Sequence, residues 1–268
     1  MNFAYILPNR KEVFLKEILY KDLRTFNLYS DTALRGRMDF LESFILTKDL
    51  NVLEKFYCLF YLRQKCIGNE INITSDKGPV SIDLDFLLEN VGGIPSVETD
   101  IPIDNVTYTL DFPHHFNTGN DDFILSLVKK IRIGNEELIL AELSSEEYQE
   151  AIERLPDTLH EYIEKFLEEC NAFFTLSLLE ERENVDIRPI KFNIMEYDFA
   201  DFITSLFQCI TATGYREMLF MLSRRINDVS FLANSTFLEV HDYFELFKDE
   251  VETQRANQPQ GGFEQQPG

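Results

Sequence analysis

The amino-acid sequence predicts an α+β fold that is mainly helical, with β-hairpins in the N-terminal half and helices in the C-terminal half. As far as residue 110, several short segments alternate apolar and polar residues around turn-forming residues, which is typical of strands. In most of the remaining chain, apolar residues recur every three or four positions, as on one face of a helix. The 24 phenylalanines and 11 tyrosines can fill a substantial core.

Three regions follow from these patterns. We expect a mixed α/β region with hairpins over residues 1–120 and a helical region over residues 121–252. Residues 253–268 form a tail of mainly Gln, Pro and Gly with little apolar content. Because such a tail cannot bury enough surface to fold alone, we expect it to be disordered.

The first elements expected are a hairpin and a helix. Residues 3–7 are apolar and extended, residues 8–11 form a turn that begins with proline, and residues 13–18 return as the second strand. Over residues 20–28 the apolar positions change to a helical spacing.

Two further helices are expected before residue 68. The first carries Leu34, Met38, Leu41 and Ile45 on one face. The second begins at Asn51, with Glu54 three residues later in the pattern of a capping box, and ends near Gly68.

Strand character returns over the next forty residues. Residues 71–84 alternate around a turn at 76–79, and a short helix is expected over 85–91. Residues 101–110 form another hairpin. Pro102 confines its first strand to a sheet edge, because proline cannot donate a ladder hydrogen bond.

Helices are expected to dominate from residue 121. Ser144 with Glu147 is a capping-box pattern that opens a helix to Leu155. Pro156 breaks this helix and starts the next, which is expected to run to about Arg182. The last helices are expected over 198–213, 215–229 and 237–252, with the first two hinged at Gly214.

The charge is strongly negative. The chain carries 47 acidic and 25 basic residues, a formal net charge of −22. Such a field repels nucleic-acid phosphates and anionic membranes, and it favours basic partners. It also keeps many proteins dispersed, so partner attraction and simple solubility both remain open as its purpose.

The acidic residues are concentrated over residues 136–183, which contain 15 acidic and three basic residues. Glu161, Glu164, Glu168 and Glu169 share the polar side of one helix, and with the late Arg224 and Arg225 they are the partner-binding candidates. The alternative is that these charges are an ordinary solvated face. The other basic groups cluster near the start, at Lys11, Lys16, Lys21 and Arg24.

The sequence offers no pattern for catalysis or metal binding. His114-His115, with Asp111 and Asp121 or Asp122, supplies metal-ligand residue types. Adjacent side chains on a strand point to opposite faces, however, so a polar loop is the expectation. Since GxSxG, HExxH, P-loop and GxGxxG patterns are absent, we expect no catalytic residue, no cofactor and no metal, and the protein is not expected to be an enzyme.

Cysteine usage and the N-terminal sequence predict an intracellular protein. No two of the four cysteines form a CxxC pair, and each lies in an apolar, helix-like segment, which favours buried free thiols. The N-terminus lacks the pattern of a signal peptide, and no apolar run approaches the ~18 residues of a membrane helix.

Several local patterns, in order along the chain, resemble the T4-type phage baseplate hub assembly proteins and, more widely, phage tail assembly chaperones. They are the segments 7–13, 16–22, 61–63, 67–71, 231–232, 236–240 and 244–247. The family pattern has a glycine in the first turn, where this chain has Asn9-Arg10, and asparagine tolerates the turn geometry. The tail does not belong to the pattern.

The resemblance implies an assembly factor or component of the baseplate hub that works by protein–protein interaction. Its partners would be phage tail or baseplate hub proteins, including the tape-measure protein, with no nucleic acid and no membrane. It would act in the host cytoplasm during assembly or within the virion tail baseplate. The alternatives are an acidic decoy that inhibits a basic host protein, and an enzyme with its site at His114-His115.

Overall fold

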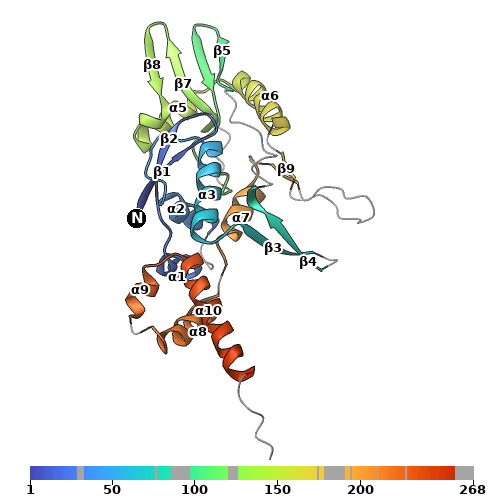
Figure 1. The fold of residues 1–268 in the computed structure, drawn as a ribbon. Coiled ribbons are helices and arrows are strands. Elements are labelled where there is room, and N and C mark those ends of the chain that lie inside the picture. Colours follow the sequence, from blue (N-terminus) through green and yellow to red (C-terminus); the bar gives the residue numbers. More distant parts are fainter. Residues whose placement is uncertain are drawn as a thin grey trace, which may run out of the picture.

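The computed structural model confirms the α+β fold and describes residues 1–28, 33–75, 78–85, 97–119, 126–173, 175–177, 191–193, 195–209, 211–226 and 228–256. Figure 1 shows an elongated molecule. A four-stranded antiparallel sheet lies at one end, a group of C-terminal helices at the other, and the long helix α3 between them. The predicted helix over 85–91 and the tail beyond residue 256 lie largely or wholly outside the described residues.

The N-terminal hairpin is confirmed. Strand β1 (Asn2–Ile6) pairs antiparallel with β2 (Glu12–Lys16), and helix α1 (Tyr20–Leu28) follows. In the connecting turn the left-handed residue is Arg10, at φ 67°, so arginine rather than Asn9 adopts the conformation that favours glycine. Asn9 instead accepts a hydrogen bond from the Lys11 main-chain N–H with its side chain.

The capping box at the start of α3 (Val52–Cys66) is also confirmed, and Glu54 does more than cap. Its carboxylate accepts hydrogen bonds from the Asn51 main-chain N–H at 3.1 Å, the Lys11 ammonium at 3.1 Å and the Asn9 amide at 2.9 Å. Glu54 is only 5% exposed. One buried carboxylate therefore ties the hairpin turn to the start of the central helix.

We predict that Glu54→Gln destabilises the protein by about 1–2 kcal/mol, because the amide brings an N–H₂ group against donors that now meet a carboxylate oxygen. Urea unfolding followed by circular dichroism measures this loss. The matched control is Glu12→Gln on the exposed side of β2, which we expect to stay within about 0.5 kcal/mol of the wild type. Equal effects of the two substitutions would contradict the role given to Glu54.

Two antiparallel sheets follow α3. Strands β3 (Glu70–Ser75) and β4 (Gly78–Asp83) form a separate hairpin. Strands β5 (Thr99–Ile103), β6 (Val106–Leu110), β7 (Val128–Ile133) and β8 (Glu136–Ile139) form a meander in that order. Pro102 lies on an edge strand as predicted.

Strands β7 and β8 correct the expectation that helices dominate from residue 121. Ile131 pairs with Leu138 and Ile133 with Glu136 across a two-residue turn, in which Gly134 takes φ 60°. A positive φ at the first turn position suits the twist of a tight hairpin, and glycine adopts it without strain. The helical part of the chain therefore begins near residue 145, after the 3₁₀ turn at Leu140–Glu142.

The next two helices match their predicted starts but not all of their predicted ends. Helix α5 (Ser145–Glu153) opens with the predicted Ser144–Glu147 capping box. Helix α6 (Asp157–Phe173) follows Pro156 but ends nine residues short of Arg182. The chain turns extended at β9 (Thr175–Ser177), which pairs with β10 (Lys191–Asn193). The β-branched Thr175 and its apolar neighbour favour a strand over a further helical turn.

The expected hinge at Gly214 is wrong. Helix α7 (Tyr197–Ser205) ends well before it, and α8 (Ala212–Ser223) starts two residues before it, so Gly214 lies within the first turn of α8. The Thr211 hydroxyl caps α8 by accepting the Gly214 N–H at 3.0 Å. Short helix α9 (Val229–Ala233) and long helix α10 (Phe237–Ala256) follow, and α10 continues past the expected end at residue 252.

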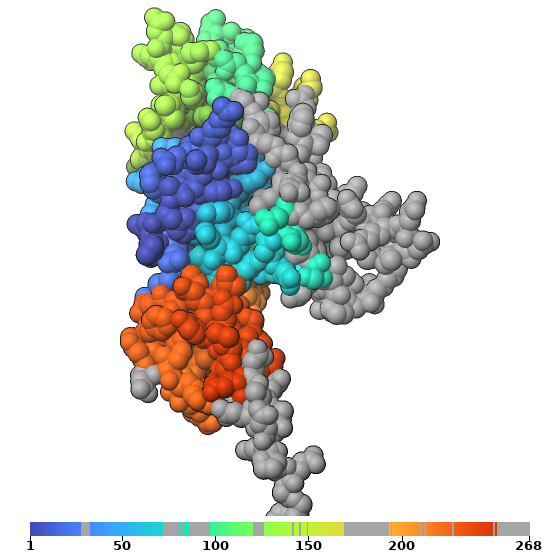
Figure 2. Space-filling model, viewed as in Figure 1, coloured from blue at the N-terminus to red at the C-terminus, as the bar shows by residue number. Residues whose placement is uncertain are grey.

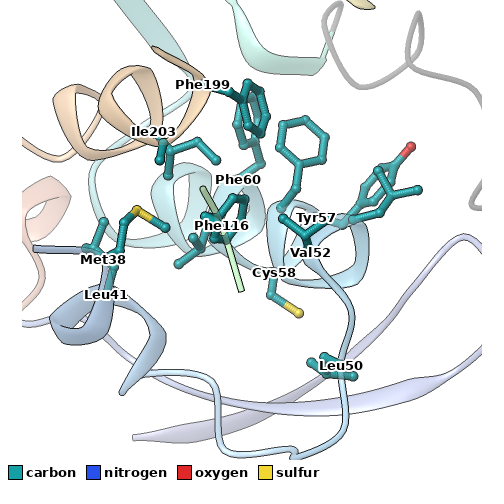
Figure 3. Close-up of a cluster of buried hydrophobic side chains, with 14 of the residues drawn as sticks. Met38, Leu41, Leu50, Val52, Tyr57, Cys58, Phe60, Phe116, Phe199 and Ile203 are labelled. Atoms are coloured by element: carbon teal, nitrogen blue, oxygen red, sulfur yellow. The ribbon is translucent and has the colours of Figure 1, made fainter. Parts of the chain in front are cut away.

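The main core surrounds α3 and draws on both halves of the chain. Figure 3 shows Met38 and Leu41 of helix α2 (Leu34–Glu42), Phe60 of α3 and Phe199 of α7 pointing into one apolar cluster. The Phe56 ring lies 4.3 Å from that of Phe60 and 5.6 Å from that of Phe199, between ring centroids. Helix α7 is thus an integral part of the core.

Arg63 near the end of α3 is a buried cation that joins three elements. Its Nε donates to the Leu206 carbonyl after α7 at 2.8 Å, and its Nη2 donates to the Glu70 carbonyl of β3 at 2.9 Å. Its Nη1 donates to the carbonyl of Gly68, which holds φ 129° at the end of the helix. Arg63 is 7% exposed, and burial lowers its pKa.

Candidate interaction surfaces

The predicted acidic face is present on α6. Glu161, Glu164 and Glu168 are exposed, while Leu159, Ile163 and Phe166 on the same helix are buried. The side chain of Glu169 lies outside the described residues. Helix α5 adds exposed Glu146, Glu150 and Glu153. The amphipathic pattern of the helix therefore leaves the glutamate side chains at the surface, where a partner can reach them.

Few cations neutralise this face in the part of the chain that the structure describes. Lys165 is exposed on α6 itself, Arg154 lies 3.5 Å from Glu150, and Lys130 lies 3.4 Å from Glu137 of β8. Glu147 is occupied by the capping box, since hydrogen bonds from the Ser144 main chain and hydroxyl lower its pKa. Tyr162, which follows Glu161 on α6, is 46% exposed and offers an aromatic contact point beside the acidic face.

Arg224 and Arg225 lie at the other end of the molecule, near the end of α8 (Figure 1). The Arg224 guanidinium stands 4.6 Å from the centroid of the exposed Phe220 ring. That of Arg225 stands 5.3 Å from the Phe247 ring and 3.7 Å from Glu250. The structure therefore separates the two arginines from the acidic face of α6.

The N-terminal basic groups are used within the fold. Besides Lys11 at Glu54, Lys21 donates to the Asn234 side chain at 2.5 Å. Lys16 stands over the Phe44 ring and Arg24 over the Tyr215 ring, at 5.4 and 5.7 Å from the ring centroids. These cations hold the hairpin and α1 to their neighbours. They are therefore less available to bind another molecule.

The His114-His115 segment follows β6 and packs beside the residues that lead into α3, and the described residues around it do not supply the neighbours that a metal site needs. The His114 ring nitrogen Nδ1 is 3.3 Å from the Leu50 carbonyl oxygen, and Asp111 is 2.7 Å from the Lys129 ammonium. Partial burial, followed by the charges of Lys55 and His114, lowers the pKa of His115. Over the described ranges, no three His, Cys, Asp or Glu side chains could share an ion, and Asp121 and Asp122 fall outside them.

Cys58 and Cys66 are buried free thiols, as predicted, and Cys209 is partly buried. Burial raises the pKa of Cys58 to about 12 and that of Cys66 to about 11, so neither is poised as a nucleophile at neutral pH. The side chain of Cys170 is not among those described. No helix within the described ranges combines the length and apolarity needed to cross a membrane.

Sequence reasoning missed an exposed apolar strip on the N-terminal hairpin. Ile6 is 67% exposed, Phe14 51% and Leu46 42%. Phe14 and Leu46 are neighbours, because the Leu46 N–H donates to the Phe14 carbonyl at 2.8 Å. A signal was present, since Val13, Phe14 and Leu15 are consecutive apolar residues and cannot all face inward on one strand.

The C-terminal helices carry a second exposed apolar group. Phe231 of α9 packs edge-on against Tyr243 of α10 at 6.0 Å between centroids, and both rings are at least 40% exposed. Leu246, on the next turn of α10, is 67% exposed. A small separate core of Tyr20, Tyr215, Leu222, Leu232 and Val240 supports these helices and joins them to α1.

Comparison with known proteins identifies the chain's family. A family model described as "T4 bacteriophage base plate protein" matches residues 2–177, which is 176 of the 268 residues. The matched segment runs from β1 to β9 and includes the hairpin, α3 and the acidic helices. No curated protein and no solved structure matches the chain. The chain therefore belongs to the T4 bacteriophage base plate protein family.

Proposed function

We propose that this protein is an assembly factor or a subunit of the phage baseplate hub that acts by binding other tail proteins. Its family membership carries the proposal, because membership implies a baseplate role. The exposed acidic and apolar surfaces are the kind of surface that protein partners cover. The residues that hold the fold together, including Glu54 and Arg63, are engaged within the chain itself.

The acidic face of α6 is the proposed contact for a basic partner, with Glu161, Glu164 and Glu168 steering its approach. Charge complementarity of this kind raises the association rate and selects the partner more than it adds affinity. Tyr162, exposed at the side of this face, would supply an aromatic contact that the partner covers. Glu169, Arg224 and Arg225 remain further proposed contacts.

Co-expression tests this function directly. The tagged full-length chain is produced together with the hub and tape-measure proteins of the same phage and purified at moderate salt. Retention of at least one tail protein is expected, and retention of none would contradict the proposal. Mass spectrometry of purified virions then distinguishes an assembly factor from a hub subunit, because only a subunit remains in the particle.

Reversing the charge of α6 is predicted to weaken capture of a basic tail protein at low salt by about tenfold, because the steering field is removed. The variant combines Glu161→Lys, Glu164→Lys and Glu168→Lys, and the association rate is measured by surface plasmon resonance. Glu70→Lys, Glu217→Lys and Asp242→Lys form the control, since they change the net charge equally at exposed positions elsewhere. Equal losses in both variants would show that net charge, and not the α6 face, governs binding.

A further inference from the structure

The main-chain hydrogen bonds around the N-terminal hairpin show which residues of each strand direct their N–H and C=O groups toward the partner strand and which direct them away from it. The Lys16 N–H donates to the Phe44 carbonyl and the Leu46 N–H donates to the Phe14 carbonyl, so Phe14 and Lys16 bond away from β1. Main-chain groups alternate in direction along an antiparallel strand. Val13 and Leu15 therefore bond toward β1, where they pair with Tyr5 and Phe3.

As far as the described residues go, the outer edge of β1 is consequently open. Phe3 and Tyr5 bond to β2, and the flanking Met1 carbonyl and Leu7 N–H also bond toward β2 or its turn. By alternation, Asn2, Ala4 and Ile6 direct their N–H and C=O groups away from the hairpin. All three residues are exposed, and none of these outward groups has a main-chain partner among the residues that the structure describes. In Figure 2 this blue N-terminal segment lies at the surface of the molecule.

This edge lacks the protection that the edges of the four-stranded sheet carry. Edge strand β5 contains Pro102, and edge strand β8 is short and begins with exposed Glu136 and Glu137. Proline and charge are the usual means by which proteins prevent strand pairing at an edge. Strand β1 has neither, and its last residue, Ile6, belongs to the exposed apolar strip that continues through Phe14 to Leu46.

The edge is also held rigidly. The Tyr5 ring stacks on Tyr61 of α3 at 4.0 Å between centroids, and Phe3 meets the same ring edge-on at 5.8 Å. Val13 and Leu15 are fully buried beneath the hairpin, and Glu54 fixes its turn. A strand presented in a fixed, extended conformation loses little entropy on binding.

We infer that the outer edge of β1 is a docking site for an extended segment of another baseplate protein, which adds as a further strand to the hairpin. Main-chain hydrogen bonds from Asn2, Ala4 and Ile6 would hold the segment, and its alternate apolar side chains would cover Ile6 and Phe14. A second copy of this chain is disfavoured, because each copy carries a net charge of −22. Only the partner's identity as a baseplate protein rests on the proposed function.

The test uses Ala4→Pro in the full-length chain. Proline at this position removes the outward N–H and blocks an incoming strand, while the bonds of Phe3 and Tyr5 to β2 remain, so the melting temperature should stay near that of the wild type. The probes are synthetic peptides of about ten residues, the length of a long strand, that tile the other baseplate proteins of the phage. At least one peptide should bind the wild-type chain, and Ala4→Pro should weaken it about tenfold or more.

Ile6→Lys provides a second variant that leaves the backbone intact and should also weaken the peptide. Its matched control is Ile133→Lys, on a strand residue of the four-stranded sheet that is 57% exposed, which should bind as the wild type does. Failure of every peptide, or wild-type binding by both Ala4→Pro and Ile6→Lys, would overturn the inference. So would a wild-type dimer that Ala4→Pro dissociates, because the occupant would then be a second copy.

The co-expression experiment keeps this inference distinct from the proposed function. If tail proteins are captured by the wild-type chain but every peptide binds Ala4→Pro as it binds the wild type, the strand site is wrong and the baseplate role stands. If peptides bind at β1 but no intact tail protein is captured, the proposed function fails and the strand site stands.

Discussion

Replacing Arg63 by alanine is expected to lower the free energy of unfolding by about 3–5 kcal/mol, the largest effect of any single polar substitution considered for this protein. The guanidinium serves the carbonyls of Gly68, Glu70 and Leu206 from a position that is 7% exposed. Its loss leaves these acceptors without their donor and opens a cavity between α3, β3 and the end of α7. Chemical denaturation of the purified variant measures the loss.

Two further variants define the cause. Arg63→Lys retains the charge but cannot reproduce the planar fork of donors, so its stability should fall between those of wild type and Arg63→Ala. Arg132→Ala removes a 48% exposed arginine that pairs with Asp100 at 3.3 Å, and it should cost less than about 1 kcal/mol. A wild-type melting curve for Arg63→Ala would contradict the role of this residue as the link between the three elements.

Phe199→Ala is expected to destabilise the protein by about 3–5 kcal/mol, because it empties a large volume in the main core. The ring is fully buried and contacts Phe56, Phe116 and Phe202 at centroid distances of 5.6 to 6.3 Å. Phe199 lies beyond residue 177, where the family match ends. The measured loss therefore also tests whether the later helices complete the core of the matched segment.

Phe220→Ala is the matched control. It removes the same side chain from a position that is 60% exposed, and it should change stability by less than about 0.5–1 kcal/mol. Differential scanning calorimetry of both variants gives the comparison. If Phe199→Ala unfolded no more readily than Phe220→Ala, α7 would not be part of the cooperative core.

Local signals in the sequence were sufficient where the structure is decided locally. The Asn51–Glu54 and Ser144–Glu147 capping boxes both form, and the N-terminal hairpin pairs around the predicted turn. The partners in the two capping boxes are three residues apart, and the paired hairpin residues are at most 14 residues apart. The sequence of such a segment contains nearly all the information that determines its conformation.

The errors arose where a local pattern suits two structures. Residues 128–139 combine alternating apolar residues with Gly134-Asn135, and pairing with β6 decides in favour of strands. Glycine weakens helices, which favours a hinge at Gly214, yet the Thr211 cap lets Gly214 lie in the first turn of α8. Arg10 holds a conformation that favours glycine, at a place where the fixed ends of the hairpin require it.

The surface features also divide into those that local sequence predicts and those that depend on contacts distant in sequence. Charge and periodicity placed Glu161, Glu164 and Glu168 on an exposed face, as the structure has them. The intramolecular use of Lys11 and Lys21 could not be predicted, because Glu54 and Asn234 are 43 and 213 residues distant in sequence. The open edge of β1 was equally hidden, since it depends on which side of the strand its partner occupies.

The packing of α7 has a consequence for how the chain folds as it is synthesised. Phe207 meets Phe26 at 6.4 Å, and the Leu206 carbonyl receives Arg63 from 143 residues earlier. The hairpin and α3 leave the ribosome long before these partners, so the part of α3 that packs against α7 stays uncovered until about three quarters of the polypeptide has emerged. Contacts so distant in sequence slow folding and expose nascent chains to aggregation. Synthesis of this protein therefore passes through a period in which the apolar residues of α3 that later meet α7 are open to contact with other chains.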